Sequence, residues 1–220
     1  MAERPARCGS RSWTTASEPA VRREGVPARR RRGLPDRGGG SRRGGGRGRA
    51  AGVGAFGRCR EALHETGLDS VALDAVASGR PFLGICVGMQ LLYDGSEEAP
   101  GAVGLGVLPG RVVRLPGGVR HPQMQWNRLQ LRGECALLDG LGAQPWMYFV
   151  HSFAPELTSE AVATCDYGGE VVALAQRDNV FATQFHPEKS SSAGLALLSN
   201  FVGLAAAERE ARQRVSPGGA

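Results

Sequence analysis

The pattern of apolar and polar residues divides the chain near residue 50. Residues 1–50 show neither the helical nor the strand period of apolar side chains. From residue 51 onward, apolar runs of both periods follow one another, and glycine or proline commonly separates them. The pattern predicts one folded domain over residues 51–205, preceded by a disordered segment at 1–50 and followed by a tail at 206–220.

The predicted elements alternate between helix and strand at first, and strands dominate later. This order is typical of an α/β sheet with antiparallel additions. Turns are expected at Pro116, at Gly168-Gly169 and at Asp178-Asn179, the first joining two neighbouring strands. The predicted helices cover residues 58–67, 69–79, 88–93 and 192–209, and the predicted strands cover 82–85, 107–115, 119–131, 146–153, 162–175 and 180–185.

Charge and cysteine content narrow the classes of function. The chain carries a net charge of +6, but 14 arginines and only four acids lie within residues 1–50, so the folded part is acidic. Nucleic-acid binding by the folded part is therefore not indicated. The absence of a long apolar run excludes a spanning helix. The five cysteines, Cys8, Cys59, Cys86, Cys135 and Cys165, form no C-x-x-C pair, so the sequence does not indicate a metal site. We expect them to be reduced thiols in a cytoplasmic protein.

The segment 1–50 is rich in arginine and glycine. Its composition favours a disordered tail. An RNA-binding arm and an organelle transit segment are the alternatives. Trp13 is the one aromatic residue available for stacking on bases, and the four acids count against a transit segment.

Two short motifs, a hundred residues apart, carry the candidate chemistry. The apolar strand at 81–85 leads directly into Cys86, and a helical run leaves it at Gly88. Such a Gly-x-Cys-x-Gly turn lifts a nucleophile above the edge of a sheet. A cysteine nucleophile needs a base and a group that orients the base. His186 and Glu188 supply both, since side chains at i and i+2 of an extended segment share one face and Pro187 favours an extended His186.

These residues resemble the class I, or triad, glutamine amidotransferase family, over residues 52–203. The chain is most similar to the glutaminase subunits of imidazole glycerol phosphate synthases. The family fold is a flavodoxin-like, three-layer α/β domain with a mixed sheet. The resemblance rests on four segments: Gly52-Val-Gly-Ala-Phe-Gly57, Gly84-Ile-Cys-Val-Gly-Met-Gln-Leu-Leu92, Tyr148-Phe-Val-His-Ser152 and Gln184-Phe-His-Pro-Glu-Lys-Ser190.

The resemblance implies hydrolysis of glutamine through a thioester. Cys86 would attack the side-chain amide with help from His186, which Glu188 would orient. His186 would then protonate the departing ammonia. The remaining expected contacts are with the oxyanion, from Gly52, Gly54 and Val87, and with the amino-acid group of glutamine, from Gln90 and Ser152.

The resemblance also implies a partner. Ammonia would pass to a (β/α)₈-barrel cyclase subunit in a heterodimer, with no cofactor and no metal. Trp126, Asn127 and Lys189 are the candidates for the face that meets the cyclase, and Lys189 is the one lysine of the chain. His151 either lines the ammonia route or packs at the end of a strand.

The chain departs from the family pattern at its N-terminus. The family begins with a strand, a loop, a helix and a second strand, and the arginine-rich segment stands in their place. We interpret residues 1–50 as the product of a wrong reading frame or start, and we expect the chain as written to fold poorly. Gln123 and Gln125 also depart from the usual His and Gly. Two alternatives therefore stay open: an inactive fragment, or another class I amidotransferase subunit, although Lys189-Ser190 argues against the latter.

Overall fold

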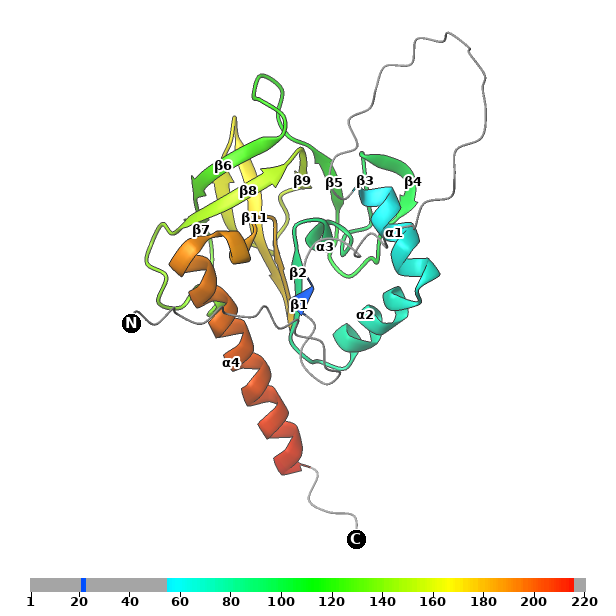
Figure 1. The fold of residues 1–220 in the computed structure, drawn as a ribbon, viewed down its shortest axis with the longest axis vertical. Coiled ribbons are helices and arrows are strands. Elements are labelled where there is room, and N and C mark those ends of the chain that lie inside the picture. The colour runs from blue at the N-terminus through cyan, green and yellow to red at the C-terminus, as the bar shows by residue number, and fades with distance from the viewer. Residues whose placement is uncertain (1–20, 23–54, 216–220) are drawn as a thin grey trace, which may run out of the picture.

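A mixed β-sheet lies at the centre of the computed structural model, which describes residues 21–22 and 55–215 (Figure 1). Neighbouring strands are parallel where β2 meets β1 and β12, and antiparallel in the rest of this sheet. In spatial order the six described strands are β1 (Val21–Arg22), β2 (Phe82–Ile85), β12 (Val180–Thr183), β11 (Glu170–Arg177), β10 (Ala161–Asp166) and β7 (Gln130–Leu131).

Two smaller sheets and four helices complete the described fold. The first small sheet has the order β4 (Ala99–Val103), β3 (Gly95–Ser96), β5 (Arg111–Arg114) and β9 (Phe153–Pro155), and the second is a ribbon of β6 (Gln123–Arg128) and β8 (Trp146–His151). The helices are α1 (Phe56–Glu65), α2 (Leu68–Ala77), α3 (Val87–Gln90) and α4 (Ser191–Val215), and 3₁₀ turns lie at Ala136–Leu138 and Pro187–Lys189.

The central sheet separates two apolar cores, because successive side chains of a strand point to opposite faces. Leu83 and Phe181 pack on the α4 side, where the rings of Phe181 and Phe201 meet edge to face at 6.3 Å. Phe82 lies on the opposite side in one core with Met89 of α3. Figure 1 shows α4 on one side of the sheet and α1 and α2 on the other. The expected three-layer α/β architecture is confirmed.

Several predicted elements agree with the structure. Strand β2 has the predicted bounds, and β10 and β11 form the predicted hairpin around Gly168 and Gly169, which both have positive φ. Asp178 occupies the predicted turn between β11 and β12 and has a positive φ of 51°. Helix α4 is longer than predicted and continues to Val215, past the position 205 at which the sequence places the end of the domain.

One predicted strand pair is wrong. The segments 107–115 and 119–131 do not pair with each other around Pro116. Strand β5 pairs with β3 and β9, whereas β6 pairs with β8 over its whole length. The predicted strand at 146–153 is divided at Ser152 into β8 and β9, so that each part joins a different sheet.

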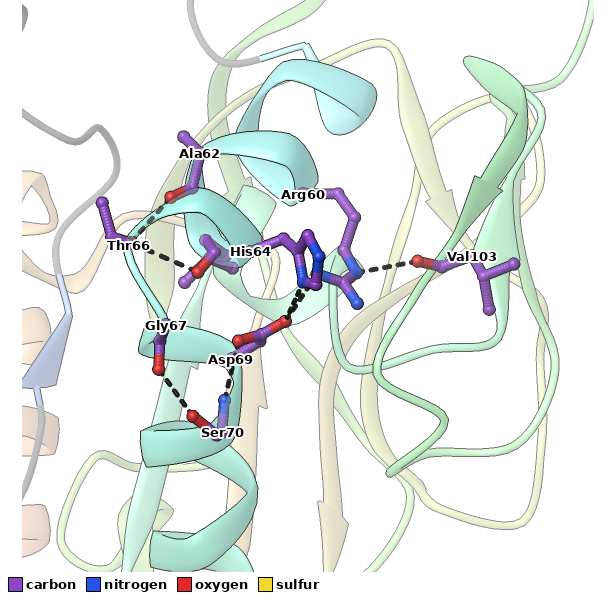
Figure 2. Close-up of polar contacts among 9 residues, drawn as sticks. Arg60, Ala62, His64, Thr66, Gly67, Asp69, Ser70 and Val103 are labelled. Carbon is purple, nitrogen blue, oxygen red and sulfur yellow. Dashed lines mark hydrogen bonds and ion pairs between the residues drawn. The ribbon is translucent and has the colours of Figure 1, made fainter.

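The corner between α1 and α2 fixes the start of the described domain (Figure 2). Asp69 accepts from Arg60 and pairs with the Nδ1 atom of His64, each at 3.0 Å, and Arg60 also donates to the carbonyl of Val103 on β4. The bond with His64 and one from the Ser70 N–H lower the pKa of Asp69. The ring of His64 is largely exposed, so this contact lies at the surface of the corner.

A second contact ties the beginning of α1 to the β3–β4 turn. The N–H of Phe56 donates to a carboxylate oxygen of Glu98 at 2.8 Å. The N–H of Arg114 on β5 donates to Glu97 at 2.8 Å. Both glutamates are exposed, yet each carboxylate accepts from a backbone N–H group that would otherwise lack a helix or strand partner.

Most of the segment expected to be disordered lies outside the described residues. Within it, Val21–Arg22 forms β1 and pairs in parallel with Leu83 and Gly84. The disorder of the remainder stays a prediction. In the described part of the chain no helix is both long and apolar enough to cross a membrane, and no cluster of three metal-ligating side chains occurs there.

Candidate active site

Cys86 follows β2 directly and has a backbone conformation that few non-glycine residues adopt. Its φ is 53° and its ψ is −112°, and it forms the N-cap of α3. Its N–H donates to the carbonyl of Thr183 at 2.7 Å, which extends the parallel pairing of β2 with β12 by one bond. A strained residue at a strand-to-helix turn matches the geometry predicted for a nucleophile elbow.

The two glycines of this elbow have different structural roles. A Cβ atom on Gly84 would lie 2.8 Å from the carbonyl oxygen of Gly88, so the tight turn requires glycine at position 84. A Cβ atom on Gly88 would meet nothing within 4 Å. Packing inside the protein therefore explains Gly84, whereas close approach of a ligand to Gly88 stays a prediction.

His186 and Glu188 follow the neighbouring strand β12 and contact each other as predicted. The Nδ1 atom of His186 lies 2.9 Å from a carboxylate oxygen of Glu188, and the imidazole is fully buried. The backbone of His186 is extended, with φ of −100° and ψ of 97°. Because Thr183 of β12 pairs with Ile85 of β2, the segments carrying Cys86 and His186 leave the sheet at the same edge.

Glu188 is ionised at neutral pH. Burial raises its pKa, but the hydrogen bond with His186, a backbone bond and the charge of Lys189 outweigh burial, so the pKa lies below its usual value. A carboxylate on Nδ1 orients the ring and stabilises positive charge on it. The pair can therefore act as a base with an orienting group.

Ser190 holds the segment that carries His186, a role that its sequence motif did not predict. Its hydroxyl donates to the carbonyl of His186 at 2.6 Å and accepts from the N–H of Tyr148 at 2.9 Å. The N–H of His186 in turn donates to the carbonyl of Tyr148. The position of Ser190 four residues after His186 was visible in the sequence, but its second partner on β8 was not.

Gln90 and Gln184 form a buried polar contact beside Cys86. The Nε2 group of Gln90 donates to the carbonyl of Phe153 at 2.9 Å and to Oε1 of Gln184 at 3.1 Å. The Nε2 group of Gln184 donates to the sulfur of Cys86 at 3.7 Å. Gln90 therefore contacts Phe153, the residue next to Ser152. Gln90 and Ser152 are the two residues predicted to hold glutamine.

His151 is a buried neutral histidine. Burial lowers its pKa to about 4, opposed by the bond to the carbonyl of Phe153, and the nearby charge of His186 lowers it further. Within the described residues its Nε2 atom has no hydrogen-bond partner, nor has Oε1 of Gln123, the residue directly opposite on β6. His151 thus packs close to the candidate base His186. Its place on the ammonia route stays a prediction.

The remaining predicted site residues are distributed as follows. Gly52 and Gly54 lie outside the described residues. Val87 is buried at the first position of α3. The carbonyl of Ser152 accepts from the N–H of Leu115, which places Ser152 at the break between β8 and β9.

The predicted partner face lies on the β6–β8 ribbon and the adjoining turn. Trp126 is 44% exposed and packs edge-on against Tyr148, with ring centroids 6.1 Å apart. Asn127 donates to the carbonyl of Asp166, so part of its side chain serves the fold. Lys189 is exposed one residue after Glu188.

The family follows from comparison with known proteins. A family model for class I glutamine amidotransferases matches residues 52–204. The chain belongs to the class I glutamine amidotransferase family. A protein of Salinibacter ruber called imidazole glycerol phosphate synthase subunit HisH is 44% identical over 170 residues, which cover 73% of this chain and 78% of that protein. The HisH protein of Desulfitobacterium hafniense is 49% identical over 152 residues, which cover 68% and 72% of the two chains.

A solved structure of a glutamine amidotransferase supports the fold. A crystal structure described as a glutamine amidotransferase matches 70% of this chain and 76% of its own with a TM-score of 0.54 and 24% identity. At this identity the match concerns the fold alone. The residues matched by the family model include the elbow and the His186–Glu188 pair.

Proposed function

We propose that the chain is the glutaminase subunit of an imidazole glycerol phosphate synthase, which hydrolyses glutamine and delivers ammonia to a cyclase subunit. One observation carries the proposal: the strained Cys86 and the hydrogen-bonded pair His186–Glu188 leave adjacent parallel strands at one edge of the sheet. The identity of the chain with HisH proteins supports this synthase rather than another amidotransferase.

The proposed reaction has two steps. The sulfur of Cys86 attacks the side-chain carbonyl carbon of glutamine, His186 carries the proton to the leaving nitrogen, and ammonia departs to leave a thioester. Water then attacks the thioester, His186 accepts a proton from it, and glutamate leaves as the sulfur is regenerated. Glu188 stabilises the positive charge that His186 carries between these transfers.

The substrate contacts complete the proposed site. The N–H of Val87 and the loop of Gly52 and Gly54 would bind the oxyanion, with each donor contributing about 3 kcal/mol to transition-state stabilisation. Gln90 and Ser152 would hold the amino-acid group. The contact of Gln90 with Phe153 supports this, since it keeps the two predicted glutamine ligands within one polar cluster.

The cyclase would be a (β/α)₈ barrel that binds to form a heterodimer in the cytoplasm. It would use the ammonia to make imidazole glycerol phosphate and aminoimidazole carboxamide ribotide. The partner face would include Trp126, Asn127 and Lys189. Met124 and Trp126 are both exposed, and their spacing of two residues places them on the same face of β6. Lys189 lies in the turn that follows His186. An exposed apolar ribbon with a neighbouring cation suits a protein partner.

The test separates glutamine use from ammonia use. The full chain is mixed with the cyclase, and imidazole formation is measured with glutamine or with an ammonium salt as the nitrogen source. We expect Cys86→Ala to abolish the glutamine-dependent rate and to leave the ammonium-dependent rate unchanged. Cys59→Ala, on α1, is the matched control and should retain both rates.

Two other outcomes decide between the alternatives. Glutaminase activity without cyclase-dependent product would indicate another class I amidotransferase. No glutamine-dependent rate with the unmodified chain, despite a cooperative unfolding transition, would indicate an inactive protein and contradict the proposal. A glutamine-dependent rate that survives Cys86→Ala would instead remove Cys86 from its proposed role.

A further inference from the structure

Gln184 links the candidate nucleophile to the rest of the site, and no role has been given to it so far. It lies between β12 and His186 and is fully buried. Its amide nitrogen donates to the sulfur of Cys86 at 3.7 Å, and its amide oxygen accepts from Gln90 at 3.1 Å. Its N–H donates to the carbonyl of Ala173 on β11, which fixes its backbone to the sheet.

The direction of these bonds is set by a backbone carbonyl. A glutamine side chain can offer a donor from one end of its amide and an acceptor from the other. The carbonyl of Phe153 can only accept, so Gln90 must present its nitrogen there. The same nitrogen reaches Gln184, which must therefore present its oxygen to Gln90. The amide nitrogen of Gln184 therefore faces Cys86 and donates a hydrogen bond to its sulfur.

We infer that Gln184 is a positioning residue, which orients the sulfur of Cys86 and stabilises its thiolate form through an N–H···S hydrogen bond. The inference rests on the proposed role of Cys86 as the nucleophile. A hydrogen bond that is stronger to the charged than to the neutral form favours ionisation. The amide does not titrate, so it supports the thiolate without competing with His186 for the proton.

A second glutamine–cysteine pair in the same chain shows what an amide alone does. Gln123 is also fully buried and donates to the sulfur of Cys165 at 3.9 Å. Burial nevertheless raises the pKa of Cys165 to about 12, against the opposing effect of that bond. The comparison shows that an amide donor lowers the pKa of a buried thiol but does not by itself offset the effect of burial.

The test follows the alkylation of Cys86 by iodoacetamide as a function of pH. The full-length chain is labelled without substrate, and the peptide containing Cys86 is quantified by mass spectrometry. We expect Gln184→Met to raise the pH of half-maximal rate by about one unit and to lower the rate at pH 7 about tenfold. A folded Gln184→Met protein with an unchanged profile would overturn the inference.

Gln123→Met is the matched control, because it removes the corresponding bond from another buried thiol. Its Cys86 profile should coincide with that of the unmodified chain. Gln184→Glu provides a second measurement should Gln184→Met fail to fold: it keeps the shape but places a carboxylate beside the sulfur. It should raise the half-maximal pH at least as far, and an unchanged profile would contradict the inference.

Alkylation separates this inference from the proposed function. If Gln184→Met moves the profile but Cys86→Ala retains the glutamine-dependent rate, the positioning of the thiol stands and the proposed nucleophile is wrong. If Cys86→Ala abolishes that rate while the profile does not respond to Gln184→Met, the proposed function stands and the role of Gln184 is wrong.

Discussion

The backbone N–H of His186 donates to the carbonyl of Tyr148 at 2.9 Å, which ties the candidate base directly to strand β8. The side chain of Tyr148 packs edge-on against Trp126, on the face predicted to meet the cyclase. The segment that positions the base thus shares one residue with the ribbon at the proposed interface. Ser190 closes the arrangement by bonding to both His186 and Tyr148.

Ser190→Ala should therefore impair both stability and catalysis. The change leaves the N–H of Tyr148 and the carbonyl of His186 without their hydroxyl partner, which costs about 2 kcal/mol in free energy of unfolding. The glutamine-dependent kcat should fall as His186 loses its fixed position. Urea unfolding and steady-state kinetics measure the two effects. Ser192→Ala, an exposed neighbour, is the control, and equal behaviour of both variants would contradict the prediction.

Substitutions at the two elbow glycines should have opposite consequences. Gly84→Ala places a methyl group 2.8 Å from the carbonyl oxygen of Gly88, and the overpacking should cost about 1–3 kcal/mol of stability. Gly88→Ala meets open space and should leave the free energy of unfolding unchanged or slightly higher, because alanine favours the helix. It should still reduce the glutamine-dependent rate if substrate approaches this backbone. Denaturant unfolding of both variants measures these changes in stability. A loss of stability for Gly88→Ala but not for Gly84→Ala would contradict the prediction.

Glu188→Gln tests charge separately from shape. The amide oxygen can keep the bond to Nδ1 of His186, but the negative charge is lost. We expect kcat for glutamine hydrolysis to fall by about a hundredfold or more. Because the pKa of Glu188 lies below its usual value, the carboxylate stabilises the native protein above about pH 4.5, and this contribution is lost as the pH falls through the lowered pKa. The variant should lack that acid-dependent loss in urea titrations.

His151 should give stability a second pH dependence, in a higher range. Its pKa of about 4 in the folded protein lies below the value of 6.5 for an ordinary histidine, so the unfolded chain binds more protons between these limits. The stability from neutral His151 is complete above about pH 6.5 and decreases on acidification to about pH 4, by on the order of 3 kcal/mol. His151→Gln should remove this slope from a series of urea midpoints. An identical slope in both proteins would count against it.

The sequence predicted the sheet edge that carries the candidate site better than the rest of the fold. Strand β2 and the elbow at Cys86 could be located because an apolar run, a cysteine and glycines stand next to one another in sequence. The pairing of β5 with β9 could not, because strands distant in sequence choose partners by burial rather than by local pattern. The bond between Glu98 and the N–H of Phe56 could not be predicted for a similar reason, because the two residues lie 42 positions apart.

The two buried histidines, finally, share one tautomer for different reasons. The Nδ1–H group of His151 donates to the carbonyl of Phe153, and the Nδ1–H group of His186 donates to Glu188. Both rings therefore turn the Nε2 side away from the partner that fixes them. Only the carboxylate can balance a second proton, since a carbonyl dipole offers no full negative charge. Of two imidazoles in the same tautomeric state, His186 is the one held by a carboxylate that can stabilise a protonated ring, as its proposed role in proton transfer requires, and His151 stays neutral.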